Sequence, residues 1–94
     1  MFDIQHTANG NVSLHGRFDA AQVEAAARVL NQIDGSCVID FDDLSYISSA
    51  GLGLLFATQR RLVDGGATLT LINLNAHIRE IFDIAGFDQI FEMG

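Results

Sequence analysis

Apolar and polar residues alternate over the first sixteen positions of the chain, a pattern typical of two short strands joined by a turn. A two-residue turn at the Asn-Gly pair would put the apolar residues of the two strands on opposite faces, because side chains alternate along a strand. A three-residue loop over residues 8–10 keeps them on one face. It pairs Ile4 with Leu14 and His6 with Val12. We therefore predict this longer loop, with its glycine in a left-handed bulge.

Three later segments place apolar residues three and four positions apart, which is the spacing of one buried helix face. The first helix is expected to begin after Asp19, whose carboxylate can cap it, and to end at residues 34–35. The second is expected over residues 49–64. The third begins after the capping residue Asn75 and stops at Gly86. The predicted apolar faces are Val23, Ala26, Ala27, Leu30 and Ile33 in the first helix, Leu52, Leu55, Phe56, Leu62 and Val63 in the second, and Ile78, Ile81, Phe82 and Ala85 in the third.

The remaining apolar segments are predicted to be strands. Residues 37–41 are apolar apart from Asp40, as expected of a strand that is buried on both faces, and a short acidic loop follows them. Residues 68–72 alternate between apolar and polar side chains. Residues 90–91 are expected to add a last short strand.

The expected order of elements is therefore ββαβαβαβ. Helices that connect successive strands imply a largely parallel sheet, and the N-terminal hairpin makes that sheet mixed. A length of 94 residues fits one domain. We predict a single α/β domain over residues 1–94, with a mixed, mostly parallel sheet of four or five strands and three main helices.

The charge of the chain excludes several classes of partner. The chain has twelve acidic residues and five basic ones, all arginine, which gives a net charge of −7. Nucleic-acid binders need clustered basic side chains, and an anionic membrane surface would repel this chain. The adjacent pair Arg60 and Arg61 fits a solvated helix face. No apolar stretch approaches the roughly twenty residues of a membrane span, and the N-terminus lacks a signal-peptide pattern. We expect a cytoplasmic protein with no nucleic acid partner and no direct membrane insertion.

The predicted topology indicates where a site would lie. Ligands and partners of open α/β sheets gather where strands end and helices begin. Three such junctions should meet at one edge of the sheet, and they carry Asp19, residues 40–49 and residues 73–75. Ser49 would lie at the start of the second helix, where unpaired amides tolerate an anion. Ser48 or Ser49 can also be a simple N-cap.

Two glycines in the first turn of the second helix also need an explanation. Gly51 and Gly53 each cost up to about 1 kcal/mol of helix stability relative to alanine. Close packing of the backbone, or the close approach of a partner, would account for them.

Enzymatic interpretations have less support in the residues. Asp40 and Asp42 follow an apolar strand, as in aspartyl-phosphate phosphatases and receiver domains, but those families also use a lysine and this chain has none. Ser49, His77 and Asp40 can be combined into a triad, but the nucleophile-elbow sequence is missing. The histidines show no metal-ligand spacing. We predict no catalytic residues, no metal and no cofactor.

A longer pattern covers nearly the whole chain. Residues 38–53 read VIDFDDLSYISSAGLG: an apolar strand that reaches an aspartate, a short loop, and a Ser-Ser-Ala-Gly-Leu that opens a helix. The segment LHGRFDA precedes it at residues 14–20, and GGA, LIN and AGF follow at residues 65–67, 71–73 and 85–87. This pattern resembles the anti-sigma-factor antagonists, the STAS-domain proteins of bacterial partner-switching systems.

The resemblance implies a protein-binding switch. Ser49 matches the serine that the family phosphorylates, and Ser48 is the second candidate for the phosphoacceptor. An anti-sigma factor that is also a serine-protein kinase would add the phosphate, and a metal-dependent serine phosphatase would remove it. The unphosphorylated form would bind the kinase and displace its other partner. The residues expected at the rim of the phosphorylation site and in partner binding are Asp19, Asp40, Ser48, Gly51, Leu52 and Asn73.

The chain departs from the family pattern at two positions. Ser48 stands where an acidic residue often precedes the phosphorylated serine, and Ala50 stands where a second serine follows it. The main alternative comes from another branch of the same family. It is a STAS subunit of a lipid-transport ABC system, which acts as a constitutive interaction module without a phosphorylation cycle.

Overall fold

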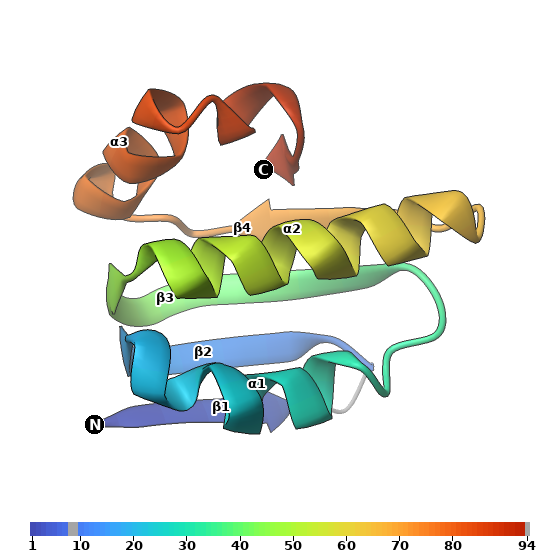
Figure 1. The fold of residues 1–94 in the computed structure, drawn as a ribbon, viewed down its shortest axis with the longest axis horizontal. Helices are drawn as coiled ribbons and strands as arrows, with labels where there is room; N and C mark the ends of the chain where they lie inside the picture. The colour runs from blue at the N-terminus through green and yellow to red at the C-terminus, as the bar shows by residue number, and fades with distance from the viewer. Residues whose placement is uncertain (8–9, 94) are drawn as a thin grey trace.

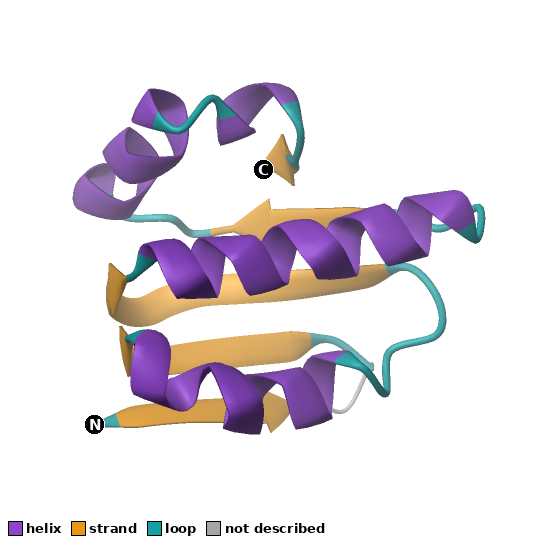
Figure 2. Cartoon of the chain, viewed as in Figure 1, coloured by secondary structure: helices purple, strands orange, loops and turns teal. Residues whose placement is uncertain are grey.

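The computed structural model of the chain describes residues 1–7 and 10–93. It is an α/β fold in which strands and helices alternate, as Figure 2 shows. Two 3₁₀ turns, η1 and η2, join the predicted elements. The bounds are β1 Phe2–His6, β2 Val12–Phe18, η1 Ala20–Gln22, α1 Val23–Leu30, β3 Cys37–Ile47, α2 Ser49–Asp64, β4 Leu69–Ile72, α3 Ala76–Ile84, η2 Phe87–Gln89 and β5 Glu92–Met93.

The five strands lie in the order β1-β2-β3-β4-β5. β1 pairs with β2 in antiparallel fashion, and the other three pairs are parallel. The predicted fold class, the order of elements along the chain and the mixed, mostly parallel sheet are therefore confirmed. In Figure 1, α1 and α2 run across the same face of the sheet, α1 over β1 and β2 and α2 over β3 and β4. Among the described residues, no helix is both long enough and apolar enough to cross a membrane.

Among the described residues, helices cover only one face of the sheet. Leu14, Ile39 and Phe41 point toward the helices and are fully buried, and the ring of Phe41 packs edge-on against Phe82 of α3. Their neighbours along the strands, among them His15 and Asp40, are only half-buried. The expectation that residues 37–41 form a strand buried on both faces is therefore wrong. We call the uncovered side the open face.

The hairpin has the predicted register. Ile4 pairs with Leu14 and His6 with Val12, as the shared apolar face requires. Gly10 has a φ of +78°, which is the left-handed conformation predicted for it. The other two residues of the predicted loop, Ala8 and Asn9, lie outside the described residues.

The first helix is shorter than predicted at both ends. The carboxylate of Asp19 accepts a hydrogen bond from the Ala21 amide (3.1 Å), but the first turn is the 3₁₀ turn η1. α1 ends at Leu30, not at residues 34–35. The guanidinium of Arg61 on α2 donates to the carbonyl of Leu30 (2.9 Å), the last residue of α1, and to that of Ile33 (2.7 Å), just beyond it. Arg61 therefore joins two helices, and the prediction of a purely solvated pair was wrong for it.

The third strand continues through the segment that we expected to be an acidic loop. β3 contains eleven residues, and its pairing with β2 shifts twice. Ser13 pairs with Asp40 and His15 pairs with Asp43, so β3 has one extra residue between these two pairs. A second extra residue follows before Tyr46. Such β-bulges turn the side chains that come after them, so Leu44 again points into the core.

The second helix has the predicted bounds, and Asn75 caps α3 as predicted by accepting from the Ile78 amide (2.9 Å). Two details differ. Val63 is 47% exposed and does not belong to the buried face. The last strand lies at Glu92–Met93 and not at residues 90–91, because the η2 turn places Phe91 against Phe82.

Candidate functional site

The carboxyl ends of β2 and β3 bring two predicted site residues to the same corner. Phe18 and Ile47 are paired at the ends of these strands, and the Ser48 amide donates to the Phe18 carbonyl (2.9 Å). η1 begins directly after Asp19, and α2 begins directly after Ser48. Both helix starts therefore lie at one end of the sheet, the left end in Figure 1. We call this corner, with Asp19, Ser48 and Ser49, the serine edge.

The two adjacent serines have different roles in the fold. Ser48 is half-buried, and its hydroxyl oxygen accepts a hydrogen bond from the Gly51 amide (3.2 Å), which makes it the N-cap of α2. Ser49 is the first residue of the helix and is exposed. Its hydroxyl makes no hydrogen bond within the described part of the chain. The geometry therefore leaves Ser49, and not Ser48, accessible to another molecule.

Packing accounts for one of the two glycines in the first turn of α2. A Cβ on Gly51 would lie 3.0 Å from Ile47 Cγ1 and 3.2 Å from Phe18 Cγ, so glycine lets the helix start close against the strand ends. Gly53 is exposed, and a Cβ there would have no neighbour within 4 Å among the described residues. Leu52 is 7% exposed, so its side chain belongs mainly to the core.

Asp40 and Asn73 lie together but away from the serine edge. The Asn73 amide nitrogen donates to Asp40 Oδ1 (3.0 Å), and the Asp42 backbone amide donates to the same oxygen (2.9 Å). Asp40 pairs with Ile72 at the end of β4, but β3 continues for seven more residues to Ile47. That length is about 20 Å along the strand. The expectation that all three junctions meet at one edge is therefore wrong for this pair, because β3 is longer than predicted.

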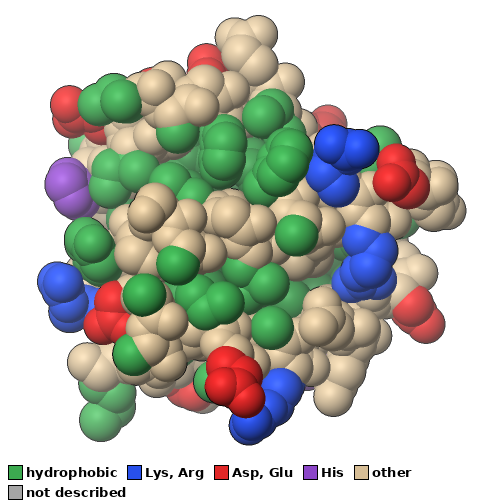
Figure 3. Space-filling view, viewed as in Figure 1, with side chains coloured by type: hydrophobic (Ala, Val, Ile, Leu, Met, Phe, Trp, Pro, Cys, Tyr) green, Lys and Arg blue, Asp and Glu red, His purple; other side chains and the backbone are tan. Residues whose placement is uncertain are grey.

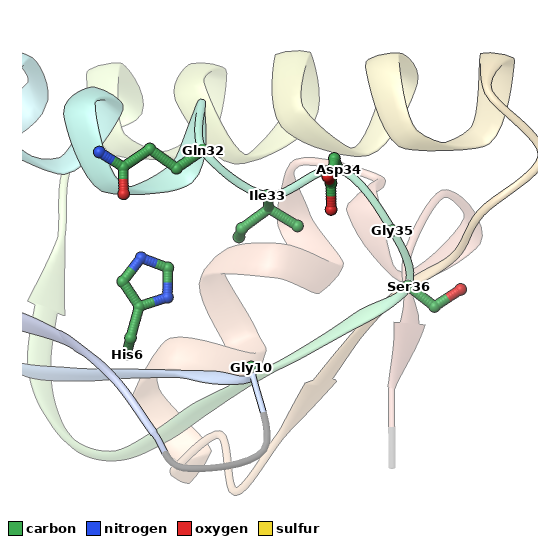
Figure 4. Close-up of a pocket in the computed structure, with 7 residues that line it drawn as sticks. All are labelled: His6, Gly10, Gln32, Ile33, Asp34, Gly35 and Ser36. Carbon is green, nitrogen blue, oxygen red and sulfur yellow. The ribbon is translucent and has the colours of Figure 1, made fainter.

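The cavity in Figure 4 lies at the opposite end of the sheet, where α1 ends and β3 begins. Its volume is about 270 Å³, and none of the predicted site residues lines it. The lining residues are His6, Gly10, Gln32, Ile33, Asp34, Gly35 and Ser36.

Apolar side chains gather on the helix-bearing side of the molecule. Figure 3 shows them in two bands along either side of α2, with charged side chains at the margins. The half-buried rings of Phe56 on α2 and Phe87 on η2 stack there, with centroids 5.8 Å apart. This side therefore offers apolar area along α2, the helix that begins at the serine edge.

Among the described residues, no group of three or more His, Cys, Asp or Glu side chains could hold a metal ion. Ser49, His77 and Asp40 share no hydrogen bond in that part of the chain. Cys37 is 3% exposed, as expected of a small buried apolar residue, and burial raises the pKa of its thiol.

The open face carries a polar cluster that is absent from the predicted site. Ser13 Oγ lies 3.1 Å from His15 Nε2, and His15 Nδ1 lies 3.0 Å from Asp43 Oδ2. Toward the serine edge, the guanidinium of Arg17 lies over the ring of Tyr46, 4.3 Å from its centroid. The spacing of Ser13 and His15 along one strand could have indicated that they share a face. The contact with Asp43 depends on the bulge in β3 and has no signal in the sequence.

Comparisons with known proteins identify relatives in sequence and in fold. A protein-family model described as "Mlab, STAS domain" matches residues 2–93. The anti-sigma factor antagonist BtrV of Bordetella bronchiseptica is 45% identical over 76 residues, which are 78% of this chain. The chain spans less than two thirds of the length of the curated relatives it matches, 64% for BtrV.

Solved structures show the same fold at low sequence identity. An anti-sigma factor antagonist from Mycobacterium paratuberculosis matches with a TM-score of 0.82 at 19% identity, over 99% of this chain and 83% of its own. The Bacillus cell fate determinant SpoIIAA, in its phosphorylated form, matches with a TM-score of 0.72 at 20% identity, over 100% of this chain and 91% of its own.

Proposed function

The chain belongs to the STAS-domain family, and on this premise we propose that it is an anti-sigma factor antagonist, a binding protein of the cytoplasm without catalytic activity in the switch. The names of BtrV and of the structurally similar antagonists support this function. Its principal partner would be an anti-sigma factor. The serine edge, together with the apolar bands along α2, would form the contact surface.

We further propose that Ser49 controls this contact. The unphosphorylated form binds an anti-sigma factor that is also a serine-protein kinase, phosphorylation of Ser49 releases it, and a metal-dependent serine phosphatase reverses the reaction. The observation that carries this proposal is the exposed hydroxyl of Ser49 at the first position of α2, beside a Ser48 whose oxygen already caps the helix. That a phosphorylated form of SpoIIAA exists is consistent with it.

The release mechanism follows from charge. A phosphate adds about −1.5 to −2 charges to a chain that already carries −7. In the free protein the N-terminus of α2 offsets part of this charge, so the fold should persist. In a complex the dianion would lose its water beside Asp19. A penalty of about 3–4 kcal/mol weakens binding several-hundredfold, which is enough to release a partner.

The other predicted rim residues contribute in different ways. Gly51 and Leu52 contribute to the serine edge through packing. Gly51 lies against the strand ends, and the side chain of Leu52 is buried. The hydrogen bond between Asn73 and Asp40 holds the loop after β4, away from Ser49. We propose that this pair supports the fold next to α3 and does not touch the phosphate.

Phosphate transfer by the cognate kinase tests the assignment of the acceptor. Ser49→Ala should incorporate no phosphate, whereas Ser48→Ala should still be phosphorylated while its helix loses about 1 kcal/mol of capping. Phosphate incorporation is measured by intact mass, and thermal melting confirms that both variants are folded. Undiminished phosphorylation of Ser49→Ala would move the acceptor to another serine.

Gly53 provides a test of the docking face. It lies one turn after Ser49 on the same exposed face of α2, and no described residue lies close enough to require a glycine there. Gly53→Ala should stabilise the protein by about 0.5–1 kcal/mol, whereas Gly53→Gln should weaken binding to the anti-sigma factor at least tenfold. Ala57→Gln, at an exposed position one turn further on, is the matched control. Equal affinities of Gly53→Gln and the wild type would mean that the partner does not cover this turn.

A further inference from the structure

The cluster on the open face has the order of a nucleophile, a base and an orienting acid. Ser13 Oγ is hydrogen-bonded to His15 Nε2, and His15 Nδ1 to Asp43 Oδ2, at 3.1 and 3.0 Å. This is the connectivity by which a histidine activates a serine hydroxyl. We propose that Ser13 is an acyl-accepting nucleophile toward activated esters of small carboxylic acids. This site is separate from the serine edge, and it does not depend on the proposed switch.

The sheet holds the three side chains in place. Ser13 and His15 are two positions apart on β2 and so point to the same side. β2 is paired on both edges, to β1 and to β3, which keeps its backbone fixed. The bulge in β3 puts Asp43, and not Asp42, opposite His15. Ser13 and His15 are half-buried, whereas Asp43 is exposed, so an ester can approach the hydroxyl from solvent.

The hydrogen bonds select the tautomer that the reaction needs. A proton on Nδ1 of His15 is donated to Asp43, which leaves the lone pair of Nε2 to accept the hydroxyl proton of Ser13. Ser13 Oγ then forms a bond to the carbonyl carbon of the ester. The bond from that carbon to the leaving oxygen breaks, and its electron pair stays on the leaving group. The proton passes from Ser13 to His15 and then to the leaving oxygen, so the products are an acyl-serine and a free alcohol or phenol.

The surroundings determine which acyl donors can react. Because both edges of β2 are paired in the sheet, the strand offers no preorganised pair of free amides for an oxyanion within the described part of the chain. The carbonyl must therefore carry a good leaving group. We expect slow transfer of a single acyl group from an aryl ester, and not rapid turnover.

Acetylation of the full chain by p-nitrophenyl acetate tests this site. The release of p-nitrophenolate gives the rate, and peptide mapping gives the acceptor. The chain has no lysine, so the N-terminal amine and Tyr46 are the main competing acceptors of a stable acetyl group. The imidazoles of His6 and His77 also release p-nitrophenolate through short-lived adducts, so the rate assigned to Ser13 is the rate at which its acetylated peptide appears. The wild type should gain one acetyl group on Ser13. His15→Gln should slow that acetylation at least a hundredfold, which is the low end of the usual contribution of a general base.

Asp43 is a positioning residue, because it acts through His15. Asp43→Asn should slow acetylation of Ser13 without changing the melting temperature, and Asp43→Glu should restore part of the rate. Ser45, an exposed serine whose hydroxyl donates to the Gly16 carbonyl (2.9 Å), is the matched control within the same protein. Acetylation of Ser13 no faster than of Ser45, or at an unchanged rate in His15→Gln, would overturn the proposal and leave the cluster as a tie between β2 and β3.

Discussion

Phosphorylation of Ser49 should weaken binding to the cognate anti-sigma factor several-hundredfold, and Ser49→Asp should weaken it at least tenfold. The phosphate is a dianion and the aspartate carries one charge, so the variant should lose about half of the expected 3–4 kcal/mol. Both charges would lie in a contact that also covers Asp19. Ser49→Ala adds no charge and should bind as the wild type does.

Calorimetric titration of the anti-sigma factor into each form measures these affinities. Gln32→Glu is the matched control, because it adds one negative charge at an exposed position beside the cavity at the opposite end of the sheet. It should bind within a factor of about two of the wild type, since charges separated by more than a Debye length are largely screened. Wild-type affinity in Ser49→Asp would argue against electrostatic release at the serine edge.

Gly16→Ala should destabilise the fold more than the substitutions proposed above for Ser48, Ser49 and Gly53. Gly16 has a φ of +84°, and a Cβ at this position would lie 1.6 Å from the carbonyl oxygen of Met1. The left-handed conformation alone costs a non-glycine residue about 1–2 kcal/mol. The overlap with the Met1 carbonyl adds to this conformational cost, because the start of β1 would have to move away from β2. We expect a loss of about 3 kcal/mol or more, a large part of the stability of a small domain.

Urea unfolding of Gly16→Ala and Gly10→Ala separates the cost of the left-handed conformation from the cost of the overlap with Met1. Gly10 has a similar φ of +78°, but an added Cβ there would meet nothing within 4 Å in the described part of the structure. Gly10→Ala should therefore show the conformational cost alone. Equal losses in the two variants would mean that the contact between Gly16 and Met1 contributes nothing to stability.

Local patterns in the sequence predict those elements whose ends depend on neighbouring residues. Ser48 and Gly65 determine both ends of α2, and the alternation of two short strands determines the register of the hairpin. Asn75 likewise caps α3 through an amide only three residues away. Each of these features rests on contacts within a few positions of the chain, which is why periodicity and capping rules identify them.

The wrong predictions concern features that depend on distant contacts. α1 ends where Arg61, about thirty residues further along, binds the carbonyl of its last residue, Leu30, and that of Ile33. β3 continues through acidic residues because β2 pairs with it and bulges accommodate the extra positions. The same unforeseen length separates Asp40 from the serine edge. The cap at Ser48 and the exposed position of Ser49 could be predicted from the sequence, whereas the contact of His15 with Asp43 could not.

The most direct test of the proposed switch is the phosphorylation state of the protein in its own cells. Intact mass and site mapping would be done on protein purified from growing and from stressed cultures. We expect a single phosphate, localised to Ser49, whose occupancy changes between the two conditions. No phosphate under either condition would contradict the switch, and would favour the alternative of a constitutive STAS module such as a subunit of a lipid-transport system.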